Sequence, residues 1–323
     1  MQQRRVAIVG VGAPVGNALC EVLEADPACS HILGVDRRAP PQLGDKLVFL
    51  PAGPDTDLRE PFCEHAITHA VLLPAAAVGH APDEPGSLPA APAVRRFFEA
   101  AAAAGLQGVL IANGTGAYRP PNGATAPRCE GDPLFEPQAP GQRLPEDLVR
   151  EQAAARFARA HPGCAVVSCR LAPVVGPGTA GVGHLLVRRK RLPVHPATTG
   201  ERAPARLQFV HIEDAAAAIA ELLFSGLSGV YNIASDDGVE LEQIARALRR
   251  PLARPAPGLA GLLGRAATWL PPWGRRRSER ALERHLEQAL VLDNRKLKRD
   301  LGYVFRYTSE GAVLEHARRL APR

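Results

Sequence analysis

Three glycines follow an apolar run near the start of the chain and precede a helical pattern. The segment reads RRVAIVGVGAPVGNALCEVL from Arg4, so the glycines are Gly10, Gly12 and Gly16. Glycines at such a turn let the backbone approach a pyrophosphate, which then lies at the N-terminus of the next helix. The spacing fits neither GxGxxG nor GxxGxxG, and Ala13 stands where the second glycine of the latter would be. We expect a dinucleotide-binding turn made by the following residues: Gly10, Gly12, Ala13, Val15 and Gly16.

An acidic residue ends the second apolar run, HILGVD. Asp36 follows Gly10 by 26 positions, where a carboxylate can accept hydrogen bonds from the hydroxyls of an adenosine ribose. A carboxylate there disfavours the extra phosphate of NADP, so we predict NAD, with NADP as the less favoured cofactor. The neighbouring Arg37 and Arg38 point the other way, because an arginine can hold a 2′-phosphate. The alternative is that Asp36 is an ordinary turn residue at the end of a strand.

The rest of the chain supplies elements that can position this turn. Short apolar runs alternate with helical patterns over the first two-thirds, which is typical of βαβ units and a parallel sheet with helices on both faces. Two Pro/Gly-rich stretches, 80–92 and 119–145, interrupt the pattern, and the longer one is typical of a functional lid or a disordered segment. The expected strands lie at 6–10, 31–36, 69–78, 108–118, 164–171, 207–212 and 229–234, and the expected helices at 15–25, 93–105 and 146–163.

Composition excludes several classes of protein. The 323 residues carry a formal net charge of +6, with basic runs at 188–191 and 273–280, but no nucleic-acid recognition motif accompanies them. The six cysteines form no CxxC and no signal peptide is evident, so we expect reduced thiols and a cytoplasmic protein. No apolar run is long enough to cross a membrane, although the amphipathic stretch 258–274 could touch one. His65 and His69 lack a third ligand, so we expect no metal site.

Five further segments resemble the extended short-chain dehydrogenase/reductase family, which includes nucleotide-sugar epimerases and dehydratases. They occur in the family's order, with sensible spacing, over nearly the whole chain. They are DLREPFCEHAITHAVLLPAAAV from Asp57, RLAPVVGPG (170–178), LQFVHIEDAAAAIAELL (207–223), GVYNIASDDGVELEQIARAL (229–248) and VLDNRKLKRDLGYVFRYTSEGAV (291–313). The resemblance implies an α/β protein: a Rossmann-type, doubly wound parallel sheet with a smaller C-terminal α/β lobe.

The resemblance also implies where the parts of this fold lie. Residues 1–171 and 208–235 would form the NAD-binding domain, and 172–207 and 236–323 the small substrate or partner lobe. Asp57 and Leu58 would contact adenine, and Ala75 and Ala76 belong to the family's alanine-rich cofactor loop. A nucleotide sugar or another small molecule is the implied substrate. A homodimer would pair the helices at 93–104 and 146–160, and neither nucleic acid nor stable membrane insertion is expected.

The family's catalytic Tyr-x-x-x-Lys pair is missing. Ionising a tyrosine near neutral pH needs a pKa shift of roughly three units, or about 4 kcal/mol, which a lysine one helical turn away helps to supply. No tyrosine of this chain is followed by lysine at that spacing. Aligning the expected helix at 146–163 puts Arg143 at the tyrosine position and Asp147 at the lysine position, and Asn113 and Gly114 occupy the family's serine positions.

Two functional classes therefore remain open. In the first, the chain is an NAD-binding member of the family that works as a sensor, a scaffold or an atypical enzyme. In the second, it is an active oxidoreductase, epimerase or dehydratase whose proton transfer uses other groups. The candidates for such groups are Thr115, Tyr118 and a residue of the 119–145 loop.

Overall fold

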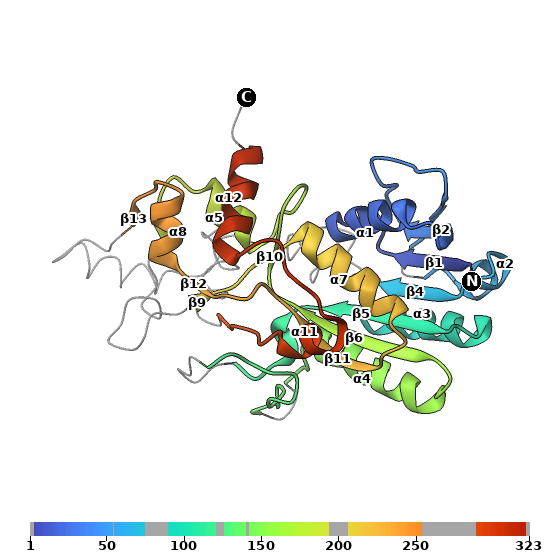
Figure 1. The fold of residues 1–323 in the computed structure, drawn as a ribbon. Coiled ribbons are helices and arrows are strands. Elements are labelled where there is room, and N and C mark those ends of the chain that lie inside the picture. The colour runs from blue at the N-terminus through green and yellow to red at the C-terminus, as the bar shows by residue number, and fades with distance from the viewer. Residues whose placement is uncertain are drawn as a thin grey trace.

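A seven-stranded sheet forms the centre of the computed structural model, which describes residues 3–53, 55–74, 90–120, 126–139, 142–193, 206–253 and 289–320. The strand order is β11-β6-β5-β4-β1-β2-β3, and all six neighbouring pairs run parallel (Figure 1). The Rossmann-type fold predicted from the sequence is thus confirmed. The strands are β1 (Arg4–Val9), β2 (Cys29–Asp36), β3 (Leu47–Pro51), β4 (His69–Leu72), β5 (Gly108–Asn113), β6 (Ala165–Leu171) and β11 (Gly229–Ile233).

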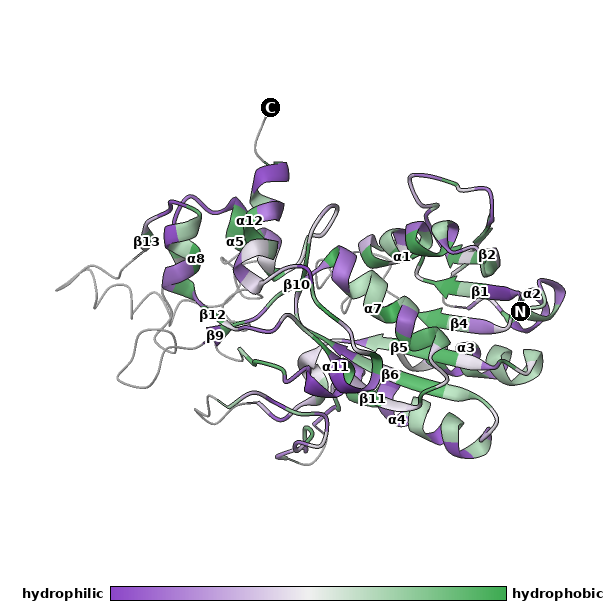
Figure 2. Cartoon of the chain, in the orientation of Figure 1, coloured by the Kyte–Doolittle hydropathy of each residue, from purple (hydrophilic) through white to green (hydrophobic). Residues whose placement is uncertain are grey.

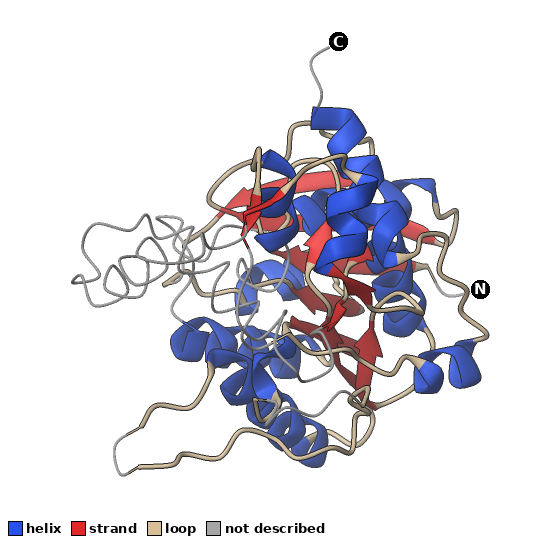
Figure 3. Ribbon diagram, turned by 90° about the vertical axis from the view of Figure 1, so that its left-hand side faces the viewer, coloured by secondary structure: helices blue, strands red, loops and turns tan. Residues whose placement is uncertain are grey.

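Helices cover both faces of the sheet, as Figure 3 shows from the side. Successive side chains of a strand point to opposite faces, so Val6 and Ile8 pack into one core and Ala7 and Val9 into the other. Both faces are therefore apolar, which explains the polar-free sequence of β1. The first core includes α1 (Pro14–Ala25), α7 (Ile212–Phe224) and α11 (Arg295–Leu301), and the second includes α2 (Arg59–Glu64), α3 (Ala90–Ala104) and α4 (Glu146–Ala160).

A third apolar core marks the smaller lobe. Its buried members lie in segments 175–209, 239–245 and 312–313, and Figure 2 shows the green inner faces of its helices. The domain boundaries expected from the sequence stay a prediction. Across the described ranges, no helix is long and apolar enough to cross a bilayer. The lobe's helices are α5 (Val182–Arg188), α8 (Leu241–Ala247) and α12 (Ser309–Leu320), and its strand pairs are β7–β10 (Val174–Val175, Val210–His211), β9–β12 (Arg206–Leu207, Val239–Glu240) and β8–β13 (Leu192–Pro193, Leu252–Ala253).

The strand β3 and the helix α2 were not expected from the sequence, because five and six residues are too few for a clear periodicity. Within 69–78, expected as a strand with its exit loop, the strand ends at Leu72. The strand expected at 108–118 is shorter and ends at Asn113. A single 3₁₀ turn, η1 (Thr115–Ala117), follows Asn113.

The described part of the long 119–145 segment is a fixed connection. Tyr118 forms an antiparallel bridge with Leu134. The amide of Arg128 donates to the carbonyl of Val291 at 2.7 Å, and the amide of Asp293 donates back to the carbonyl of Arg128 at 2.8 Å. Residues 126–139 therefore join the end of β5 to the start of the C-terminal segment, and this part of the stretch is not a free lid.

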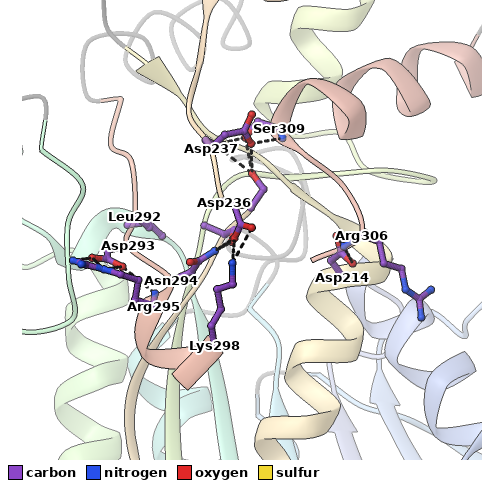
Figure 4. Close-up of polar contacts among 12 residues, drawn as sticks. Asp214, Asp236, Asp237, Leu292, Asp293, Asn294, Arg295, Lys298, Arg306 and Ser309 are labelled. Carbon is purple, nitrogen blue, oxygen red and sulfur yellow. Dashed lines mark hydrogen bonds and ion pairs between the residues drawn. The ribbon is translucent and has the colours of Figure 1, made fainter. Parts of the chain in front are cut away.

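Carboxylates at the end of β11 hold the same C-terminal segment (Figure 4). Asp236 pairs with the ammonium of Lys298 at 2.8 Å. The carboxylate of Asp237 accepts the backbone amide of Ser309 at 2.9 Å, which fixes the start of α12. The lobe is thus attached to the sheet by directional polar contacts as well as by apolar packing.

A buried asparagine joins these segments. The side-chain amide of Asn232, which is fully buried, donates to the carbonyls of Arg128 at 2.9 Å and Asp293 at 3.0 Å. Its side-chain oxygen accepts the Tyr118 hydroxyl at 2.7 Å, and its backbone amide donates to Glu130 at 2.9 Å. The Asn232 carboxamide thus makes three hydrogen bonds, and removing the side chain would remove all three.

We expect Asn232→Ala to lower the free energy of unfolding by about 2–4 kcal/mol, because it removes the three side-chain hydrogen bonds of a fully buried residue and leaves a cavity in their place. Urea unfolding followed by circular dichroism measures this loss. The control is Gln107→Ala, which truncates an exposed carboxamide and should change stability by no more than about 0.5 kcal/mol. Equal losses in the two variants would contradict the role given to Asn232.

Candidate functional site

The turn between β1 and α1 accepts only glycine at three positions. Gly10 has a φ of +98°, and a Cβ there would lie 2.4 Å from the carbonyl oxygen of Leu73. A Cβ on Gly12 would lie 2.6 Å from the carbonyl oxygen of Arg38, and one on Gly16 would lie 2.3 Å from that of Gly10. Both are below any ordinary contact distance. The unusual spacing therefore still gives a tight turn with a helix packed close to its strand.

The helix that follows this turn has no side-chain cap at its start. Ala13 is the N-cap residue of α1 and Pro14 occupies the first turn. The first amides of a helix lack intrahelical partners and carry a partial positive charge, so an uncapped start favours an anion. The segment after β7 lies beside this point, because a Cβ on Gly178 would be 3.8 Å from the Pro14 ring.

The carboxylate of Asp36 fixes the turn to the end of β2. One oxygen accepts the backbone amide of Gly12 at 3.0 Å. The other accepts the amides of Arg37 at 2.6 Å and Arg38 at 3.3 Å. A carboxylate offers about four acceptor positions, so at least one remains for a ribose hydroxyl. The structure thus brings Gly10, Gly12, Gly16 and Asp36 together at the carboxyl edge of the sheet.

The expected adenine contact has a different set of partners. Asp57 accepts the backbone amide of Arg59 at 3.0 Å at the start of α2 and binds the Arg59 guanidinium through both oxygens. Hydrogen bonds from Arg59 lower the pKa of Asp57 to about 2. Leu58 is buried and packs in the core on the α2 side of the sheet. Ala75 and Ala76 lie outside the described residues.

An aspartate holds the turn after β5, where the family's lysine would stand. The carboxylate of Asp147 accepts the backbone amides of Gly114 and Gly116, each at 3.1 Å. Its side chain also pairs with the guanidinium of Arg150, whose side chain is 3% exposed. A Cβ on Gly116 would lie 2.6 Å from this carboxylate, so the turn fits closely around it.

Arg150 continues this network into the sheet. Its Nε donates to the side-chain oxygen of Asn113 at 2.9 Å, and the Asn113 amide donates to the hydroxyl of Ser168 at 3.0 Å. Asn113 is fully buried and Ser168 is nearly so. The sequence analysis did not identify Arg150 or Ser168. The available signal was the i, i+3 spacing of Asp147 and Arg150 on an expected helix, which favours ion pairing.

The candidates for proton transfer lie in different environments. The Tyr118 hydroxyl donates to Asn232 and to the carbonyl of Cys129 at 3.1 Å, and burial raises its pKa. Thr115 is partly exposed at the start of η1, and among the described residues its hydroxyl has no side-chain hydrogen bond. Arg143, at the family's tyrosine position, is exposed. Of the two hydroxyl candidates, Thr115 is the more exposed residue.

No metal site is evident in the described ranges, where no group of three or more His, Cys, Asp and Glu side chains converges. His65 instead lies 2.9 Å from His31, and the rings stack. His69 contacts the hydroxyl of Thr68 at 2.9 Å and packs against Phe224.

We expect Asp147→Asn to lower the free energy of unfolding by about 2–4 kcal/mol, because it leaves the Arg150 charge without its buried partner. The control is Glu146→Gln on the same helical turn. Glu146 also contacts Arg150, at 3.4 Å, but its side chain is 64% exposed, so its loss should cost at most about 1 kcal/mol. Urea unfolding of both variants measures the difference, and an equal cost would contradict the assignment.

Comparisons with known proteins agree with this geometry. Among curated proteins, an uncharacterized protein of Mycobacterium tuberculosis is 26% identical over 331 residues, covering 97% of this chain and 83% of the relative. Among solved structures, the NAD complex of a Thermus thermophilus UDP-glucose 4-epimerase has a TM-score of 0.69 at 20% identity, covering 98% of this chain and 100% of that one. The NAD complex of the Bordetella bronchiseptica enzyme WbmG has a TM-score of 0.66 at 20% identity, covering 98% and 93%.

The family model that matches the chain covers most of the sheet described above. It spans residues 6–234, from β1 to the end of β11. This range includes the glycine turn, Asp36 and the Asp147 network. The chain therefore belongs to the NAD dependent epimerase/dehydratase family.

Proposed function

We propose that this chain binds NAD at the carboxyl edge of its sheet. The observation that carries the proposal is the glycine turn, in which a side chain at Gly10, Gly12 or Gly16 would collide with backbone atoms. The uncapped start of α1 would hold the pyrophosphate through its amides, and Asp36 would accept the ribose hydroxyls.

The position of Asp36 supports NAD over NADP. Its carboxylate lies at the end of β2, where a 2′-phosphate would meet a like charge. The side chain of Arg37 runs toward Gly53, since a Cβ on that glycine would lie 3.8 Å from the Arg37 Nε. Arg37 thus has a packing position of its own beside the sheet.

We propose further that the chain does not use the family's phenol and ammonium pair. When bound in such a site, NAD supplies a hydride acceptor for an alcohol carbon. The protein must then take the hydroxyl proton. At the lysine position, however, Asp147 already accepts two backbone amides and pairs with Arg150. A negative charge there opposes ionisation of a nearby hydroxyl.

Two readings of this site follow. In the favoured one, the chain is an NAD-binding member of the family that works as a sensor, a scaffold or an atypical enzyme. In the other, it is an oxidoreductase, epimerase or dehydratase that positions substrate through Thr115, the partly exposed threonine after β5. A nucleotide sugar is the substrate class suggested by the family. The guanidinium of Arg206, near where family members hold the sugar nucleotide, donates to the carbonyl of Gly238.

Assembly and location remain part of the proposal. A homodimer would pair α3 and α4, which already pack against each other through stacked rings of Phe98 and Phe157, 4.7 Å apart. A cytoplasmic site of action suits thiols that are all free, four of them buried.

Isothermal titration calorimetry tests the cofactor proposal. We expect wild-type protein to bind NAD more tightly than NADP. We expect Asp36→Asn to weaken NAD binding by about 10- to 100-fold, because a hydrogen bond to a charged acceptor contributes about 1.5–3 kcal/mol. The control is Asp45→Asn, which changes an exposed acid in the loop after β2 and should leave affinity unchanged. Absence of heat with both dinucleotides would refute NAD binding.

The absorbance of the reduced nicotinamide tests the catalytic proposal. Over a panel of alcohols, ketones and nucleotide sugars, we expect bound NAD without turnover. If turnover is found, Thr115→Val should abolish it at constant NAD affinity, whereas Tyr118→Phe should mainly lower stability. Turnover that survives Thr115→Val would exclude Thr115 as the group that positions the substrate and place the proton acceptor elsewhere in the site.

A further inference from the structure

Figure 1 shows α8 and β13 at the end of the smaller lobe farthest from β1, and seven cationic residues belong to this strand and helix end and to the segment paired with it. They come from two segments of the chain. These segments lie side by side because β8 and β13 pair in parallel and the amide of Leu192 donates to the carbonyl of Pro251 at 3.1 Å. The guanidinium of Arg250 also donates to the carbonyl of Arg189. We call these residues the arginine surface: Arg188, Arg189, Lys190 and Arg191 at the end of α5, and Arg246, Arg249 and Arg250 at the end of α8.

The arginine surface carries more positive charge than the fold needs. Basic side chains stabilise helix C-termini, but two helix ends supply only about −0.5 charge each. One acidic residue, Glu242, lines the hollow of about 490 Å³ beside Arg246, Arg249 and Arg250. Among the described residues, no carboxylate pairs with these three arginines or with Arg188. Five members of the arginine surface are exposed: Arg188, Lys190, Arg191, Arg246 and Arg249.

One of these arginines occupies a position that normally requires glycine. The amide of Arg249 donates to the carbonyl of Arg246 at 3.0 Å, and the amide of Arg250 donates to that of Ala245 at 2.9 Å. These two bonds form a Schellman motif, in which the first residue after the cap is left-handed and usually glycine. Arg249 has a φ of +53° there. An exposed, strained arginine contributes little to folding, which indicates a use outside the fold.

We propose that the arginine surface binds the surface of an anionic phospholipid bilayer. Groups of four to eight Lys and Arg side chains bind anionic lipid headgroups, and exposed cations suit an extended layer of phosphates better than a small enclosed anion.

Sedimentation of the full-length protein with vesicles tests this proposal. We expect binding to vesicles of phosphatidylcholine mixed with phosphatidylglycerol and none to pure phosphatidylcholine. Raising the ionic strength from about 0.1 M to about 1 M should release the protein, because the screening length falls from about 10 Å to about 3 Å. The same binding to both kinds of vesicle, or none to either, would overturn the proposal.

Charge reversal assigns the binding to named residues. Each cation near an anionic bilayer contributes roughly five-fold in affinity, so Arg246→Glu/Arg249→Glu should weaken vesicle binding on the order of 25-fold or more. Arg188→Glu/Arg191→Glu, on the other segment, should act in the same direction. The matched control is Arg295→Glu/Arg299→Glu on α11, where the native side chains are 87% and 71% exposed; it makes the same change of net charge and should keep wild-type binding.

Two further measurements close the test. Thermal unfolding followed by circular dichroism should give cooperative transitions for all three variants, so a loss of binding reports charge and not folding. A short DNA duplex is the competing polyanion. Release of vesicle-bound protein by the duplex at equal phosphate concentration, together with tighter binding to the duplex, would make the surface a nucleic-acid site and overturn the lipid assignment.

Discussion

The carboxylate of Asp147 sets the limits on chemistry at this site. It fills the space between the amides of Gly114 and Gly116, and it balances the buried charge of Arg150. The two charges depend on each other, because an isolated guanidinium at 3% exposure would be costly. A lysine introduced alone at position 147 would place two cations side by side. A change of charge at position 147 would therefore have to be accompanied by changes in the network around β5.

A second buried guanidinium, that of Arg170, lies on the strand next to β5 and also pairs with α4. The guanidinium of Arg170 is 1% exposed, pairs with Glu151 and lies 4.3 Å from the centre of the Tyr118 ring. The helix α4 is therefore joined to β6 by the ion pair of Glu151 with Arg170, and to β5 and the turn after it by the hydrogen bonds of Arg150 and Asp147. Arg170 stacks on the aromatic ring of Tyr118. The hydroxyl of Tyr118 donates a hydrogen bond to the side-chain oxygen of Asn232. Polar groups that would be mobile in an open cleft are here part of the interior.

The sequence predicted the parts of the fold whose constraints are local. The glycine turn follows from steric limits on three residues, and Asp36 follows from its place at a strand end. The short β3 and α2 were missed because five or six residues carry too little periodicity. The role of Arg150 was missed for another reason: its partners Asn113 and Asp147 are 34 positions apart, and only the folded chain brings them together. The length of the Pro/Gly-rich segment 119–145 predicted a functional lid or a disordered segment, whereas its described part is fixed by Asn232, more than 90 residues away.

The hydrogen bonds of Asn232 have a mechanical consequence. They join β11, the 126–139 connection and the start of the C-terminal segment, so these three parts must rotate together. The chain also crosses between the sheet and the lobe at residues 207–212 and at residues 172–178, so any opening of the lobe must bend both segments; in the second, Gly176 and Gly178 have φ values of +147° and +75°. Flexure at that point would carry the residues beside Pro14 with it. Movement of the lobe would then open or close access to the carboxyl edge of the sheet.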